Sequence, residues 1–258
     1  MIQTETCYMC AAPATSREHV PPLCLFPEPK DVLGFNFRKD LITVPSCDLH
    51  NSKKSTDDEF LMVTMASVVG GNFLGYLHLQ TKISRALRRK SKDFLNKAIV
   101  RNSKMHTIES ASGKKYPVML GNPDGERLIS CFRHIAHGLY YHEFHKKFEG
   151  EIRILFGFVQ YNDQFTDTML QLINHKLVTE NTFETPKGSN GKVFTYNFCQ
   201  PDAHGLIALK LSFYGSTDVY ISYLPKGAAE PFDLPTALAK AGISTTIQVG
   251  GKNFEFNK

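Results

Sequence analysis

The sequence contains no apolar run of membrane-spanning length, and this absence argues against a transmembrane helix. Its longest apolar stretch, residues 60–69, is interrupted by Thr64 and Ser67 and predicts a buried helix instead. The opening residues, MIQTETC, lack the basic and then apolar segments of a secretory signal. Internal repeats and low-complexity tracts are missing as well. We therefore expect a globular protein in the cytoplasm, without a membrane partner.

Cysteine is scarce, with six among 258 residues, and its distribution argues against a disulfide framework. Three of the six lie in short-spaced pairs near the N-terminus. The other three are scattered through apolar contexts: Cys24, Cys131 and Cys199. An odd and scattered remainder is typical of buried free thiols in a reducing compartment.

Two pairs of metal-ligand residues stand out in the first sixty positions, Cys7-x-x-Cys10 and Cys47-x-x-His50. A two-residue gap lets one tight turn direct both side chains of a pair at the same metal. Four such ligands are what a tetrahedral structural zinc requires, so we predict a zinc site here. Cys24 is an alternative to His50 as the fourth ligand, although it lacks the two-residue spacing.

A second set of polar residues lies between and directly after these pairs: Glu18, His19, Asp40 and Asn51. Carboxylate and amide oxygens bind hard divalent cations. An imidazole titrates near neutral pH and can act as a general base toward water. Because the zinc pairs would hold both ends of this segment, the pattern predicts a structural metal that supports a catalytic one.

Residues 5–60 resemble the HNH nucleases, also called the ββα-metal family. The family pattern is Cys-x-x-Cys, then Asp-His-Ile/Val-x-Pro, then an Asn before a second Cys-x-x-Cys, and His or Asn directly after it. The corresponding runs here are Cys7-x-x-Cys10, Glu18-His19-Val20-Pro21-Pro22, Asp40-Leu41 and Cys47-x-x-His50-Asn51. This chain departs from the pattern with Glu18 for the first Asp, Asp40 for the middle Asn, and His50 as a zinc ligand.

The resemblance implies a metal-dependent endonuclease. In that case His19 would deprotonate the attacking water, and Glu18 and Asn51 would hold a catalytic Mg²⁺ or Mn²⁺. Asp40 would orient His19 through the imidazole nitrogen that does not face water. The implied substrate is a phosphodiester in nucleic acid, DNA in preference to RNA, and the implied context is restriction or phage defence.

Two other interpretations use the same residues. A zinc-stabilised module without catalysis, binding nucleic acid or a protein, would need the four zinc ligands but not the Glu18-His19 pair or Asn51. This alternative stays open. A redox role for Cys7 and Cys10 would need a thioredoxin-like βαβ context, which the sequence does not indicate, and we set it aside.

Positive charge is concentrated in the first part of the chain. Residues 1–105 hold 15 Lys and Arg against 10 Asp and Glu, which accounts for the whole net charge of +5. Such an excess favours a polyanionic partner. The densest basic cluster occupies one side of predicted helices over residues 73–89 and 91–102: Arg85, Arg88, Arg89 and Lys92. This row could follow a phosphate backbone or form a solvated helix face, and we weigh the two equally.

At 258 residues the chain can bury a substantial core. We predict an α+β fold in three parts. They are a zinc-bound ββα-metal (HNH) module at residues 1–70, a basic helical segment at 71–115, and an α+β domain with an antiparallel sheet at 116–258. The sequence indicates no chemistry in the third part, which leaves a homo-oligomer contact or a protein partner open there.

Two further patterns have both a functional and a structural interpretation. Asp57 and Asp58 open a predicted helix, where acidic residues favour the positive helix end, and we prefer this to metal binding. A predicted helix over residues 123–147 is capped by Asn122 and carries four histidines opposite its apolar stripe: His134, His137, His142 and His145. We prefer a polar face to a second metal site, because no Cys or acidic cluster accompanies them.

Overall fold

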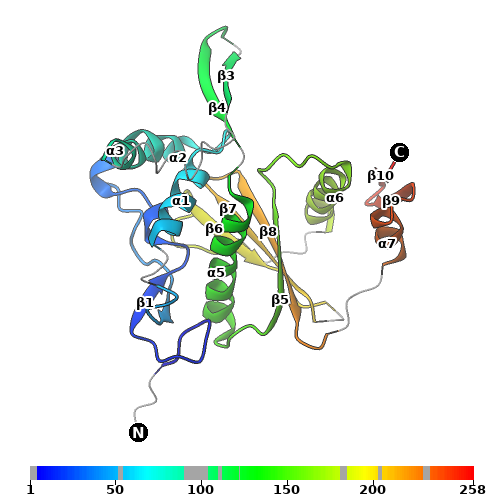
Figure 1. Cartoon of the computed structure of the whole chain (residues 1–258), viewed down its shortest axis with the longest axis horizontal. Coiled ribbons are helices and arrows are strands. Elements are labelled where there is room, and N and C mark those ends of the chain that lie inside the picture. Colours follow the sequence, from blue (N-terminus) through cyan, green and yellow to red (C-terminus); the bar gives the residue numbers. More distant parts are fainter. Residues whose placement is uncertain are drawn as a thin grey trace. The chain divides into compact units, whose positions relative to one another are not determined.

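The computed structural model of the chain has an α+β fold, as predicted (Figure 1). It falls into two compact units. Unit 1 comprises Met1–Phe148, Gly188–Phe194 and Phe213–Thr217, and unit 2 comprises the rest. The residues described are 5–51, 55–89, 104–109, 112–121, 123–180, 185–202, 205–228 and 233–258. Within these ranges, the helices are too short or too polar to cross a membrane.

Unit 1 begins with two short strands and a helix. Strand β1 (Ser16–His19) pairs with β2 (Thr43–Ser46) in antiparallel register, from Ser16 opposite Ser46 to His19 opposite Thr43. Helix α1 (Ser55–Ala66) follows. All its residues from Phe60 to Ala66 are buried, because the helix is apolar on every side in this stretch. The buried helix expected at residues 60–69 is confirmed up to Ala66.

A long connection between β1 and β2 contains two 3₁₀ turns, η1 (Leu23–Leu25) and η2 (Pro29–Asp31). A residue distant in the sequence stabilises the turn η1. The buried Tyr214 hydroxyl donates a 2.6 Å hydrogen bond to the carbonyl of Leu25. Such a bond satisfies a carbonyl that would otherwise be buried without a partner. This loop and the elements around it form the wall of the cavity described below.

The helical segment after α1 runs from residue 73 to residue 89. It consists of α2 (Phe73–His78), a π-helical turn η4 (Leu79–Ile83) and α3 (Ser84–Arg89). The side chain of Asn72 caps α2 by accepting hydrogen bonds from the N–H groups of Leu74 and Gly75. The predicted helix is confirmed, while the one predicted over residues 91–102 lies outside the described residues.

Strands β3 (Lys104–Glu109) and β4 (Lys115–Leu120) form an antiparallel hairpin. Helix α5 (Gly125–Phe144) follows and buries the predicted apolar stripe, including Phe132, Ile135 and Leu139. Its N-cap is Asp124, which accepts a hydrogen bond from the N–H of Arg127, whereas the predicted cap, Asn122, lies outside the described residues.

Helix α5 packs against both β2 and α1. Residues up to Phe148 therefore belong with the N-terminal elements, so the compact units do not follow the boundaries predicted at 70/71 and 115/116. The sequence could not indicate this, because the apolar stripe of α5 does not specify which elements cover it.

Gly138 on α5 allows a close approach to Val20, which directly follows β1. A Cβ at Gly138 would lie 2.6 Å from Cγ2 of Val20. We expect Gly138→Ala to destabilise the protein by roughly 1–3 kcal/mol through overpacking, although alanine gains about 1 kcal/mol of helix propensity. Urea unfolding measures the change. Gly125→Ala in the same helix is the matched control, because nothing lies within 4 Å of its Cβ position. Equal stability of the two variants would contradict the close packing.

Unit 2 is built on a four-stranded sheet with strand order β5-β8-β7-β6. The strands are β5 (Gly150–Phe156), β6 (Phe194–Phe198), β7 (Ile207–Phe213) and β8 (Thr217–Pro225). Alternate residues of β7 are buried, as expected of a strand with one face in a core. Aromatic residues on these strands are buried in the protein core: Phe194, Tyr196, Phe198 and Phe213.

A smaller cluster in unit 2 joins two helices to the predicted C-terminal hairpin. Helix α6 (Gln164–Glu180) packs against β9 (Thr245–Val249) and β10 (Lys252–Phe256), and α7 (Leu234–Lys240) packs against β9. Buried Phe254 and Phe256 lie at its centre. The hairpin turns at Gly250 and Gly251, as predicted.

Candidate metal centre and adjoining polar cavity

Cys7, Cys10, Cys47 and His50 come together at the base of the β1–β2 hairpin. Their ligand atoms all lie within 4.8 Å of one another. Nδ1 of His50 is 3.4 Å from Sγ of Cys7 and 3.3 Å from Sγ of Cys47, and the sulfurs of Cys10 and Cys47 are 3.8 Å apart. The predicted grouping of these four side chains is therefore confirmed.

These separations fit a tetrahedral zinc. Zinc–sulfur bonds of about 2.3 Å at tetrahedral angles place two sulfurs about 3.8 Å apart, and a sulfur and an imidazole nitrogen about 3.6 Å apart. Three cysteines and one histidine are also a common donor set of closed structural zinc sites. Cys24 is not part of the group, because its Sγ donates a hydrogen bond to the carbonyl of Asp58 instead.

Local hydrogen bonds explain why each pair can face one metal. In the first pair, the N–H of Cys7 donates to the carbonyl of Ala12, and the next residue, Tyr8, donates to the carbonyl of Pro45 in β2. In the second pair, the N–H groups of His50 and Asn51 both donate to the carbonyl of Cys47, which closes a tight turn after β2. The strand therefore brings the two turns together.

The environment of Cys7 favours the thiolate form that a metal requires. Burial alone would raise the pKa of the Cys7 thiol, but hydrogen bonds from the backbone at Met9, Cys47 and Cys10 outweigh it and lower the pKa to about 6. Nζ of Lys147 adds positive charge nearby by donating a 2.6 Å hydrogen bond to the carbonyl of Cys10.

Two histidines of α5 pack against other rings, whereas the sequence favours a polar face for this side of the helix. The ring of His134 lies 5.9 Å from that of His50, and the ring of His137 packs beside Phe148. Burial, followed by the charge of His134, lowers the pKa of His137 to about 4. Within the described ranges, they do not form a second group of metal ligands.

A polar cavity of about 340 Å³ in unit 1 contains most of the predicted catalytic residues. Glu18, His19 and Asn51 all line it. The remaining residues of its wall come from the β1–β2 connection, α1 and η4, with Arg17 from β1: Arg17, Leu23, Cys24, Arg38, Asp58, Glu59 and Lys82. The cavity therefore has acidic and basic groups around one histidine.

Glu18 and Asn51 offer oxygen donors to this cavity. Glu18 is only 4% exposed. The Asn51 amide nitrogen donates to the Ser16 hydroxyl at 2.7 Å and lies 3.5 Å from the carbonyl of Arg17. Because a carbonyl can only accept, these contacts assign Nδ2 to the strand side and leave Oδ1 as the acceptor.

His19 closes β1 and lines the cavity. Burial, and then the positive charge of Arg38, lowers the pKa of its imidazole. Among the described residues, its ring makes no hydrogen bond. A neutral imidazole without an internal partner can accept a proton from a water molecule in the cavity.

Asp40 does not occupy the position that the sequence predicted. Its side chain is 76% exposed, and its carboxylate lies 4.0 Å from Nζ of Lys39. Its φ of 54° places it in the left-handed region, where aspartate is tolerated better than most residues. The backbone carbonyl of Asp40 accepts a hydrogen bond from the hydroxyl of Ser189. The structure brings Asp40 into no contact with His19 within the described part of the chain, so an orienting role is not supported.

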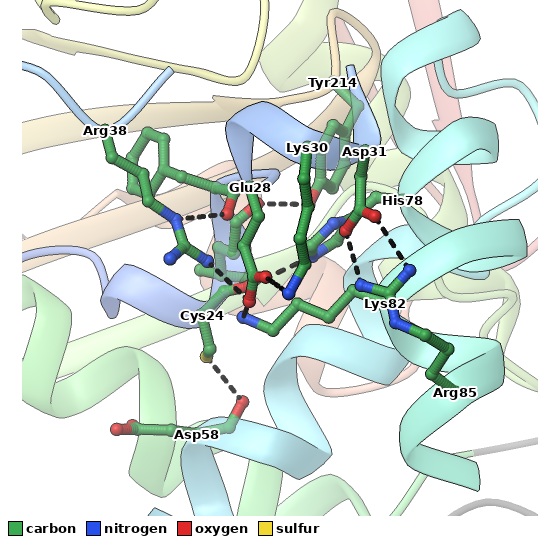
Figure 2. Close-up of polar contacts among 12 residues, drawn as sticks. Cys24, Glu28, Lys30, Asp31, Arg38, Asp58, His78, Lys82, Arg85 and Tyr214 are labelled. Carbon is green, nitrogen blue, oxygen red and sulfur yellow. Dashed lines mark hydrogen bonds and ion pairs between the residues drawn. The ribbon is translucent and has the colours of Figure 1, made fainter. Parts of the chain in front are cut away.

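Arg85 belongs to the basic cluster predicted on the helices after α1, but its guanidinium is bound within the protein. The two terminal nitrogens of its guanidinium each make a 2.7 Å hydrogen bond to a different oxygen of Asp31, whose side chain is only 5% exposed. This paired arrangement anchors α3 to η2 and does not present Arg85 to a phosphate (Figure 2). Lys92 and the side chains of Arg88 and Arg89 lie outside the described residues.

We expect Arg85→Met to destabilise the protein by about 1–3 kcal/mol, because it leaves a nearly buried carboxylate without its partner. Urea unfolding measures this, with Lys39→Met at an exposed ion pair as the control, expected within about 0.5 kcal/mol. The hydrogen bonds from Arg85 lower the pKa of Asp31. The pair therefore stabilises fully at neutral pH, and the difference between wild type and variant should shrink as the pH falls through that pKa. A constant difference would contradict this assignment.

Sequence reasoning missed Arg38 and Lys82, which line the cavity from outside the predicted motif. Asp57 and Asp58 lie in the first turn of α1, as predicted. Asp57 also forms a 2.7 Å ion pair with Arg127 that links α1 to α5, and Asp58 also lines the cavity. No local signal could have identified these residues, because they reach the cavity only through packing of distant segments.

Comparison of this chain with protein-family models, with curated proteins and with solved structures finds no match. What its residues can do must therefore be argued from the metal centre and the cavity.

Proposed function

We propose that the protein is a divalent-cation-dependent endonuclease that hydrolyses phosphodiester bonds in nucleic acid, DNA in preference to RNA. One observation carries this proposal: Glu18, His19 and Asn51 line a single cavity. The chain order of β1, β2 and α1 gives further support, because it matches the strand–strand–helix order of the ββα-metal nucleases that the sequence resembles.

The Cys₃His group serves as a structural zinc site in this proposal. All four positions are occupied by protein ligands, which leaves no open position for a substrate. Asn51 follows the ligand His50 directly, and the strand that carries Glu18 and His19 pairs with the strand that leads to Cys47. Zinc would therefore hold the turn with Asn51 against β1.

The oxygen donors of the cavity fit a hard cation. Glu18 and Asn51 would bind it, and Asp58 and Glu59 add two carboxylates to the same cavity. Mg²⁺ or Mn²⁺ bound there would supply positive charge to the scissile phosphate and to the leaving oxygen.

His19 then acts as the general base. It takes a proton from a water molecule whose oxygen forms a new bond to phosphorus, while the bond from phosphorus to the leaving oxygen breaks. The leaving oxygen takes a proton from solvent. Burial and Arg38 support this role, because both keep the imidazole neutral before the reaction.

Cleavage of a supercoiled plasmid by the purified protein tests the proposal. We expect nicking or linearisation with Mg²⁺ or Mn²⁺, none after EDTA treatment, and recovery when Mg²⁺ is restored, with about one zinc per chain throughout. Zinc content must be measured after the EDTA step, because loss of the structural metal would also stop cleavage. Metal-independent cleavage would contradict the proposed role of the divalent cation. No cleavage of any DNA or RNA substrate with zinc bound would favour the non-catalytic zinc module.

We also propose that the protein works in a reducing compartment such as the cytoplasm. None of the six cysteines forms a disulfide, and the thiols of the Cys₃His group must stay reduced to bind a metal.

A further inference from the structure

Three cations converge on one carboxylate beside the cavity. Glu28 lies 2.6 Å from Nζ of Lys30, 3.5 Å from the Arg38 guanidinium and 3.6 Å from Nζ of Lys82 (Figure 2). One negative charge therefore faces three positive charges. The neighbouring Asp31–Arg85 pair is neutral as a whole.

Two of these cations line the cavity and are largely shielded from water. The side chains of Arg38 and Lys82 are 23% and 21% exposed, whereas Lys30 is 69% exposed and is not part of the cavity wall. Nη2 of Arg38 is buried and makes the 3.5 Å ion pair with Glu28, but it has no hydrogen-bond partner within the described residues. A buried charged donor is costly unless a partner satisfies it.

The two cations are held firmly in place. Nε of Arg38 donates a 3.0 Å hydrogen bond to the carbonyl of Phe26. Lys82 lies on η4, one helical turn after the fully buried His78, whose Nε2 contacts the carbonyl of Cys24 at 3.0 Å. This contact ties the helix to the turn η1. The cationic groups are therefore preorganised and need little rearrangement to receive a ligand.

Their charges act on each other and on the proposed base. Burial, and then the charge of Arg38, lowers the pKa of Lys82. The same guanidinium lowers the pKa of His19. An anion placed in the cavity next to Arg38 and Lys82 would relieve the repulsion between the two cations and would lie in the same cavity as His19.

We propose that Arg38 and Lys82 form an anion-binding subsite that receives a phosphate group of the DNA backbone. This proposal rests on the proposed nuclease function. It assigns the basic side of the cavity to a phosphate group of the substrate. Acidic groups on Glu18, Asp58 and Glu59 suit a divalent cation, and the basic pair suits the phosphate that this cation would accompany.

Lys82 and Lys30 offer a matched pair of variants. Both lysines form an ion pair with Glu28, so either Lys→Met change removes one positively charged partner of that carboxylate. Only Lys82 lines the cavity. Binding of a labelled DNA duplex to the zinc-loaded full-length protein, without added divalent cation, is measured at several salt concentrations. We expect Lys82→Met to weaken binding about threefold to tenfold and to reduce the salt slope by about 0.9, while Lys30→Met changes both much less. Equal effects of the two variants, or no effect of Lys82→Met, would overturn the subsite.

A second measurement avoids any folding defect in a variant. Acetylation of the wild-type protein by acetic anhydride, followed by mass spectrometry, compares the reactivity of Lys82 and Lys30. DNA should protect Lys82 more than Lys30. Equal protection of the two lysines by DNA, or no protection of Lys82, would overturn the proposal.

These readouts separate the subsite from the proposed reaction. Because binding and protection are measured without cleavage, a selective effect at Lys82 supports the subsite even in a protein that cuts no substrate. If Lys82→Met changed neither cleavage nor binding, the subsite would be refuted and the nuclease function would stand.

Discussion

Replacing His19 with alanine should slow metal-dependent plasmid cleavage by about 10²–10⁴-fold, which is the usual contribution of a positioned general base. The structure indicates that this loss would come from chemistry and not from misfolding. Within the described chain, the imidazole makes no hydrogen bond that holds other elements together. Its neighbours at the cavity wall, Glu18 and Asn51, are positioned by β1 and by the turn after β2.

The control for this prediction is His106→Ala. His106 is an exposed histidine on β3 and does not line the cavity, so its loss should leave cleavage unchanged. Zinc content and thermal unfolding should match wild type in both variants. Full activity of His19→Ala would refute its role as the base, and loss of zinc from that variant would place His19 in the structural site instead.

Replacing Cys47 with serine should have the largest effect on stability. Structural zinc contributes folding free energy directly, because the metal site does not exist in the unfolded chain. We expect loss of zinc and a destabilisation of at least about 3 kcal/mol, which corresponds to a fall of roughly 6–12 °C in Tm. Atomic emission spectroscopy and calorimetry measure the two effects. Cleavage should be lost as well, because the turn that carries Asn51 begins at Cys47.

Cys24→Ser is the matched control for Cys47→Ser. It keeps a donor for the carbonyl of Asp58 and leaves the four predicted zinc ligands intact. This variant should retain about one zinc per chain and nearly wild-type stability. If Cys24→Ser lost the metal while His50→Ala kept it, Cys24 would be the fourth ligand, contrary to the geometry of the Cys₃His group.

Several features of the structure could be predicted from sequence because short-range geometry determines them. A two-residue gap forces both members of Cys7/Cys10 and of Cys47/His50 toward one side of a turn, whatever surrounds them. The period of apolar residues likewise predicted the buried face of α5. In each case a few neighbouring residues carry the information.

The contents of the cavity depend on contacts between segments that are far apart in the chain. Asp40 lies near His19 in a family pattern, but the path of the β1–β2 connection directs its side chain into solvent. Arg85 looks available for phosphate on a helical projection, but Asp31, fifty-four residues earlier, binds it. A linear pattern cannot indicate such pairings, because side-chain contacts depend on how the elements pack.

By itself, the sequence determined the metal-ligand group, the α+β class and the identity of the residues available for catalysis. The tertiary structure alone decided which of them share a cavity: Glu18, His19 and Asn51 do, Asp40 does not, and Arg38 and Lys82 join them. The physical reason is one of range. Turn geometry and periodicity act over a few residues, whereas a binding site is enclosed by side chains whose proximity arises only when the core packs.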